Sequence, residues 1–163
     1  MANAPSLDTT FQPLVGDGRP LHEWLTTFHL ASVVIDPYTN ESAWILDTAG
    51  RILRQFAGAS IRVNFIVTAD AIDAKHFLGP LAKEFLVFTD PSRTIVKQLG
   101  LTELPAFVFI RMDGTVPSAA EGWNASAWHV VAEAIAKTVS WKMPLIPEPG
   151  DPVSFRGSSA LTQ

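Results

Sequence analysis

The sequence contains no cysteine. That absence excludes disulfide bonds, thiolate catalysis and metal sites with cysteine ligands. The N-terminal stretch MANAPSLDTT lacks the basic and apolar regions of a secretory signal peptide, and no apolar run approaches the ~20 residues that a membrane helix needs. We therefore expect a protein with no membrane partner, and we take the cytoplasm as its default location.

An excess of positive charge is also missing. The chain has 12 Lys and Arg against 16 Asp and Glu, a net charge of -4, and no basic block. Because binding to a phosphate backbone depends on clustered Lys and Arg, nucleic acid is not an expected partner. A hydrophobic fraction of 47% over 163 residues is typical of one folded globular domain.

Apolar periodicity indicates alternating strands and helices. Buried strands are predicted at 31–37, 61–70, 84–90 and 106–110, followed by a short returning strand at 115–119. Helices are predicted at 21–30, 41–58, 70–79, 91–100 and 127–141. This order predicts an α/β fold in which helices sandwich a mixed central sheet, with an antiparallel edge added by the Asp113-Gly114 turn.

The chain divides into a lead-in, a domain and a tail. Residues 1–20 are the N-terminal lead-in, of which 1–13 are expected to be flexible, and residues 21–142 form the domain. The proline-rich tail, 143–163, can be neither a regular helix nor a central strand. Three interpretations of the tail stay open: an extended strap on the domain surface, disorder, or a docking segment for a partner.

The stretches VVIDPYTNESAW and TELPAFVFI resemble the thioredoxin-like superfamily. The first reads as a strand leading into a loop and a helix, and the second as a loop, then Pro105, then a strand. With the DG hairpin and the last helix, the resemblance covers about residues 21 to 141. TDPSRTIVKQLGLTELPAFVFIRMDGTV is similar to the peroxiredoxin and thiol–disulfide oxidoreductase branch. The resemblance implies a thioredoxin-like fold in which Pro105 is cis and faces the redox loop.

The active-site cysteines of that superfamily have no counterpart in this chain. DPYTNES overlays on the pattern Asp-Pro-x-Cys-x-x-Cys, which places Thr39 and Ser42 where the thiols would be. A helix N-terminus lowers the pKa of a thiol into the useful range, but an aliphatic hydroxyl starts far too high for the same effect. We therefore expect neither disulfide oxidoreductase nor cysteine peroxidase activity.

The polar residues of this loop allow two interpretations each. Thr39 and Asn40 either cap the following helix, with Glu41 in its first turn, or form a polar patch beside Pro105 that accepts an extended peptide. Asp36 either starts a turn or is a buried carboxylate with a raised pKa.

Other polar groups favour structural roles. His129 and Glu133 are spaced i, i+4 on the last predicted helix, but no third ligand accompanies them, so no metal site is predicted. Asp70 and Asp73 are expected to cap a short helix and to place charge in its first turn, although paired carboxylates can also act as acid and base. Trp123 is expected in the core, with a partner surface as the alternative. No cofactor is predicted.

The predicted function is that of a redox-inactive thioredoxin-like module, chaperone-like or assembly-related, that binds a partner protein or an extended peptide. No catalytic residue is assigned. The predicted vestigial groove consists of Asp36, Tyr38, Thr39, Asn40, Ser42, Leu104 and Pro105. Two alternatives stay open: an enzyme with glutathione- or other cofactor-dependent chemistry in the same cleft, and a homo-oligomer subunit that makes contacts through Trp123, Trp141 and the tail.

Overall fold

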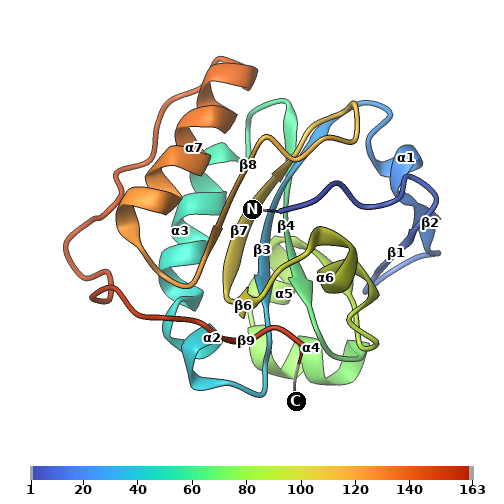
Figure 1. Ribbon diagram of the computed structural model, residues 1–163, viewed down its shortest axis with the longest axis horizontal. Coiled ribbons are helices and arrows are strands. Elements are labelled where there is room, and N and C mark those ends of the chain that lie inside the picture. The colour runs from blue at the N-terminus through green and yellow to red at the C-terminus, as the bar shows by residue number, and fades with distance from the viewer. Residues whose placement is uncertain (1, 162–163) are drawn as a thin grey trace.

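A seven-stranded mixed sheet organises the chain in the computed structural model, which describes residues 2–161 (Figure 1). The strand order is β2-β1-β5-β4-β3-β7-β8. Strands β3, β4 and β5 are parallel, whereas β7 runs antiparallel to β3, so the predicted mixed sheet is confirmed. The bounds are β1 Thr10–Pro13, β2 Arg19–Pro20, β3 His29–Ile35, β4 Ile61–Val67, β5 Leu86–Thr89, β7 Ala106–Ile110 and β8 Ser118–Glu121.

Helices cover both faces of this sheet, as predicted. Helices α3 and α7 pack on one face, and α1 and α6 pack on the other (Figure 1). The bounds are α1 Leu21–Trp24, α2 Asn40–Trp44, α3 Leu46–Phe56, α4 Ala71–Leu78, α5 Leu81–Glu84, α6 Thr94–Leu99 and α7 Ala125–Val139. Strand β3 contributes Val33 to the first core and Val34 to the second, which explains why it is apolar throughout.

Two predicted helices differ from the observed ones. The helix predicted at 21–30 ends at Trp24, because His29 and Leu30 already belong to β3 and pair with β4. The helix predicted at 41–58 is divided at Ile45, which ends α2 and precedes α3. A continuous apolar stripe cannot reveal such a break, since it runs through both pieces.

The N-terminal segment is more ordered than the sequence suggested. β1 pairs with β5 and with β2, and Phe11 is fully buried against Phe88. The expectation that 1–13 are flexible is therefore wrong for β1. Four residues are too few to display a clear strand periodicity.

The tail runs along the domain as an extended segment that ends at a second, two-stranded sheet. This sheet consists of β6, Glu103–Leu104, and β9, Ser158–Ser159. Ile146 of the tail is buried in the core of the α3–α7 face, and Figure 1 shows the remainder crossing the molecule beside α2 before it reaches β6. The last two residues predicted in the tail, 162–163, lie outside the described residues.

Candidate functional site

The end of β3 and the beginning of β7 define one corner of the sheet. Val34 pairs with Ala106 across these antiparallel strands, so Asp36 and Pro105 lie at the same end of the sheet. The peptide bond between Leu104 and Pro105 is cis, as the resemblance implied. The structure thus brings together the two segments from which the groove was predicted.

Asp36 is both a turn residue and a buried carboxylate. Its side chain is 1% exposed, and one carboxylate oxygen accepts a hydrogen bond from the backbone N–H of Tyr38 at 3.0 Å. The other oxygen forms an ion pair with the Nη2 of Arg93 at 2.8 Å. The turn and the burial of Asp36 therefore occur together, because one oxygen accepts the turn hydrogen bond and the other pairs with Arg93.

The hydroxyl groups of Thr39 and Ser42 are used inside the loop. The Thr39 hydroxyl donates to the carbonyl oxygen of Asp36 at 2.9 Å, so it does not cap α2, although Thr39 occupies the N-cap position. Ser42 is fully buried, and its Oγ accepts a hydrogen bond from the Asp36 N–H at 2.9 Å. The predicted capping role of Thr39 is wrong, and Ser42 presents no surface to a ligand.

Tyr38 and Asn40 are the exposed members of the predicted set. The Tyr38 hydroxyl donates to Asp73 at 2.5 Å, and this hydrogen bond to a carboxylate raises the pKa of Tyr38 to about 12. Asp73 in turn donates its N–H to the side chain of Asp70, which caps α4 as predicted. Asn40 is the first residue of α2 and is exposed.

Leu104 contributes only its backbone to the groove. Its side chain is fully buried in the core with residues of α1 and α6. An apolar side chain next to a proline gains more free energy from the core than from a solvent-facing groove. Its carbonyl oxygen accepts a hydrogen bond from the Ser158 hydroxyl at 3.3 Å.

Arg93 is the residue of this corner that the sequence did not single out. It precedes α6 with a left-handed backbone, φ 61°, and it is 4% exposed. Besides the ion pair with Asp36, its Nη1 donates to the carbonyl oxygen of Ala160 at 2.5 Å. The available signal was the strand-ending Asp36, since a buried carboxylate requires a cationic or hydrogen-bonding partner.

The tail occupies the backbone edge directly before Pro105. β9 pairs antiparallel with β6, in the register Glu103 to Ser159. The Ala160 N–H donates to the carbonyl oxygen of Thr102 at 3.0 Å, and Ala160 is fully buried. The backbone edge on which a guest peptide was predicted to pair is therefore occupied by the chain's own β9, which lies beside β6 in Figure 1.

Glu103 holds the tail through two different oxygens. One accepts the N–H of Gly157 at 2.8 Å, and the other pairs with the Nε of Arg156 at 2.9 Å. A Cβ atom added at Gly157 would lie 2.8 Å from the carbonyl oxygen of Leu104, closer than a real Cβ atom lies to backbone. This position therefore requires glycine, because any side chain would push the tail away from β6.

Aromatic residues hold the tail against the domain before it reaches β6. Phe155 and Trp123 exchange two backbone hydrogen bonds, of 2.9 and 3.0 Å. The Phe155 ring packs edge-on against Trp44 of α2 with the ring centroids 5.3 Å apart. Trp123 itself is 1% exposed and donates its Nε1–H to the Pro152 carbonyl at 2.7 Å. Trp123 is therefore a core residue, as expected, and the tail covers it within one chain.

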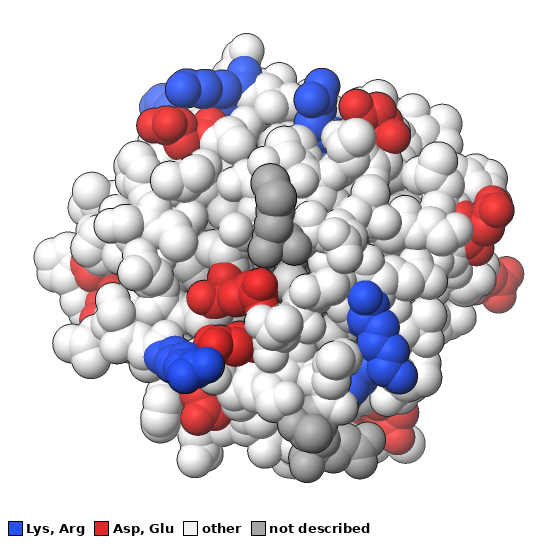
Figure 2. Space-filling view, in the orientation of Figure 1, with Lys and Arg blue, Asp and Glu red and all other residues white. Residues whose placement is uncertain are grey.

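The face of the molecule drawn in Figure 2 carries charges of both signs. The face in Figure 2 shows Lys and Arg scattered among Asp and Glu, without a continuous basic surface. Within residues 2–161, no three His, Asp or Glu side chains gather as metal ligands. No helix of that described part is long and apolar enough to span a bilayer, and the cytoplasmic location stays a prediction.

Solved structures that are similar to this chain in fold include redox enzymes. A protein from Chlorobium tepidum described as the thiol:disulfide interchange protein DsbE shares 15% identity over 85% of this chain and 98% of its own, with a TM-score of 0.68. The bacterioferritin comigratory protein of Xanthomonas campestris, which reduces alkyl peroxides, shares 12% over 81% and 91%, with a TM-score of 0.63. A hypothetical protein from Sinorhizobium meliloti shares 15% over 100% of this chain and 95% of its own, with a TM-score of 0.65.

This chain has a thioredoxin-like fold. Identities of this size establish the fold alone, and neither a protein-family model nor a curated protein matches the chain. The alignment with the Sinorhizobium protein extends through the tail. Two features of this chain bear on its site: it has no cysteine, and its own tail lies on the edge beside the cis proline.

Proposed function

We propose that this chain is a redox-inactive thioredoxin-like protein that binds an extended peptide of a partner protein along β6. The observation that carries the proposal is the pairing of β9 with β6 next to the cis Pro105. An edge strand with unpaired N–H and C=O groups accepts any extended chain of suitable side chains. The tail supplies an example of a chain that this edge accepts.

The contacts of the tail indicate which peptide would fit. Gly157 marks a position that excludes every side chain, and the fully buried Ala160 marks a position for a small one. Arg156 faces the carboxylate of Glu103, and Phe155 packs against Trp44. The favoured ligand is therefore an extended segment with an aromatic residue, a basic residue, glycine and then small residues.

Arg93 links this edge to the polar loop. Its guanidinium contacts Asp36 and also the Ala160 carbonyl, so it recognises the backbone of whichever chain lies there. A charged donor on a carbonyl oxygen makes a stronger hydrogen bond than a neutral one. In the proposed function the pair Asp36–Arg93 replaces the missing thiols as the polar element that meets the bound chain.

The tethered tail competes with any partner. A segment held by a short linker is present at an effective concentration of about millimolar, so a free peptide of equal intrinsic affinity is excluded at micromolar concentrations. A partner therefore binds where it forms more contacts than the tail, or when the tail is drawn away. This behaviour is suited to assembly or chaperone-like work, in which the site must stay covered until a partner arrives.

The test releases the tail in the full chain. Gly157→Val places a side chain against the Leu104 carbonyl, and the tail should leave β6. A fluorescent peptide with the sequence of residues 155–161, FRGSSAL, should then bind at least about tenfold more tightly to the variant than to the parent chain, since the tethered competitor is gone. Fluorescence anisotropy measures both affinities.

Ser154→Val is the matched control, because it adds the same side chain at an exposed tail residue that lies three positions before Gly157. It should bind the peptide as weakly as the parent chain does. A peptide with valine at the glycine position should bind neither variant. Failure of Gly157→Val to bind FRGSSAL, with its circular dichroism unchanged, would contradict the proposal.

The predicted homo-oligomer is one form of the same exchange. If the tail of one copy leaves its own β6, it can pair with the β6 of a second copy and make the same contacts. Light scattering at increasing protein concentration measures this exchange. We expect the apparent molar mass to increase more steeply with protein concentration when the segment between α7 and β9 is shortened. A short segment disfavours pairing of β9 with β6 within one copy.

A further inference from the structure

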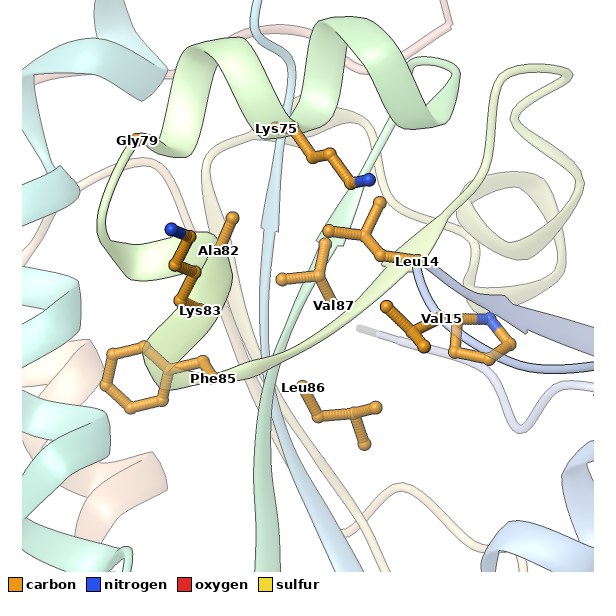
Figure 3. Close-up of a pocket in the computed structure, with 10 residues that line it drawn as sticks. Leu14, Val15, Lys75, Gly79, Ala82, Lys83, Phe85, Leu86 and Val87 are labelled. Atoms are coloured by element: carbon orange, nitrogen blue, oxygen red, sulfur yellow. The ribbon is translucent and has the colours of Figure 1, made fainter.

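A cleft lies between β1, β5 and the α4–α5 segment (Figure 3). Its volume is about 610 Å³, which is within the range of roughly 300–1,000 Å³ typical of small-molecule sites. It is lined by Pro13, Leu14, Val15, Lys75, Gly79, Ala82, Lys83, Phe85, Leu86 and Val87.

The cleft exists because β1 leaves β5 early. The Leu14 N–H still donates to the Val87 carbonyl at 3.0 Å, and then the chain turns away at Gly16, which has φ 98°. Beyond this point the edge of β5 at Leu86 has no neighbouring strand from β1. Val15 is left 84% exposed at the rim of the cleft.

Among residues 2–161, the charged side chains that line the cleft are those of two lysines. Figure 3 shows Lys75 extending from α4 and Lys83 from α5, with the apolar side chains of Leu14, Val87 and Leu86 on the strand side. Within residues 2–161, neither lysine forms an ion pair, since the acidic Glu84 next to Lys83 pairs with Arg54 instead.

We propose that this cleft binds a small amphipathic anion, an apolar chain that carries one carboxylate. The apolar walls from β1 and β5 would bury the chain, and the amines of Lys75 and Lys83 would pair with the carboxylate at the rim. A neutral apolar ligand would leave both amines unused, and a cation would be repelled by them. This proposal is independent of the peptide edge at β6.

The experiment uses the full chain with dodecanoate as the probe and dodecanol as its uncharged analogue, both below their micellar concentrations. Lys75→Met with Lys83→Met removes both charges and keeps the apolar stems. Dodecanoate should bind the parent chain in equimolar amount by calorimetry, and the double variant should bind it about tenfold more weakly, the typical effect of losing a charge-assisted contact. Dodecanol should bind both chains equally.

Two further variants locate the site. Lys97→Met makes the same change at an exposed lysine of α6, on the other face of the sheet, and it should leave dodecanoate affinity unchanged. Ala82→Trp fills the cleft and should abolish binding of both probes. The proposal is overturned if dodecanoate does not bind, if the double lysine variant binds it as tightly as the parent, or if binding survives Ala82→Trp.

Discussion

The pair of Asp36 and Arg93 is the residue-scale feature on which the polar corner depends. The two side chains are 1% and 5% exposed, and each has a further hydrogen bond, to Tyr38 N–H and to the Ala160 carbonyl. A buried charge without its partner is costly, whereas the intact pair contributes little net free energy. The pair therefore serves mainly to fix the positions of the loop after β3 and of the tail relative to Arg93.

Arg93→Met should lower the free energy of unfolding by about 3–5 kcal/mol, because Asp36 then stays buried without a cation. Urea denaturation measures the loss. The double variant Asp36→Asn with Arg93→Met should recover part of it, since both charges of the pair are then removed together. An Arg93→Met chain as stable as its parent would show that the guanidinium does not stabilise Asp36.

Tyr38 is the only tyrosine of the chain, so its titration can be followed directly by the ultraviolet absorbance of the phenolate. The hydrogen bond to Asp73 raises its pKa from 10.0 to about 12 in the folded chain. The stabilising effect of that hydrogen bond is complete below pH 10.0, the unfolded value, and is lost as the pH rises through about 12.

Asp73→Asn should return the Tyr38 midpoint toward 10.0, because the carboxylate that favours the protonated phenol is gone. Asp8→Asn removes an equal charge elsewhere and should leave the midpoint in place. Identical titration curves for the parent and Asp73→Asn chains would rule out the hydrogen bond.

At the scale of elements, one side chain, that of Asn124, caps the first turn of α7. Asn124 accepts the N–H of Ala127 at 3.0 Å, which satisfies one of the free donors of the first turn. Asn124→Ala should therefore cost about 1 kcal/mol of stability in thermal unfolding. Asn40→Ala, the same change at an exposed residue of α2, should cost less than about 0.5 kcal/mol. Equal effects would contradict the cap.

The elements that the sequence predicted are those with long apolar signals. β3 is buried on both faces and reads as one apolar run, and α7 carries a regular apolar stripe. β1, β6 and β9 were not predicted, because two to four residues show no period and their partners lie far along the chain. Local patterns also could not place the break at Ile45.

The candidate site was likewise predicted only in part from the sequence. The corner of Asp36 and Pro105 followed from the resemblance to thioredoxin-like proteins. Arg93 did not, because it meets Asp36 across 57 residues. The tail was open to three interpretations, since proline content constrains its backbone but does not say where an extended chain lies.

For the whole molecule, the question is whether the tail is a permanent part of the fold. The tail contacts the domain at three places: Ile146 is buried in the core, Phe155 pairs with Trp123, and β9 pairs with β6. Between Ile146 and Phe155 the tail forms a turn that is held by the ion pairs of Arg51 with Glu148 and Asp151. The segment after Phe155 is extended and partly exposed, and such segments open more readily than central strands. We therefore expect β9 to leave β6 while the seven-stranded sheet stays intact, which is what exchange with a partner requires.

Native-state amide hydrogen exchange tests this claim most directly. The N–H groups of Gly157 and Ala160 donate to Glu103 and Thr102, and the N–H of Val34 lies in the centre of the sheet. The account predicts that Gly157 and Ala160 are protected, yet exchange with a lower opening free energy than Val34. Exchange of all three only through global unfolding would show that the tail closes the groove permanently, and would contradict a peptide-binding role for β6.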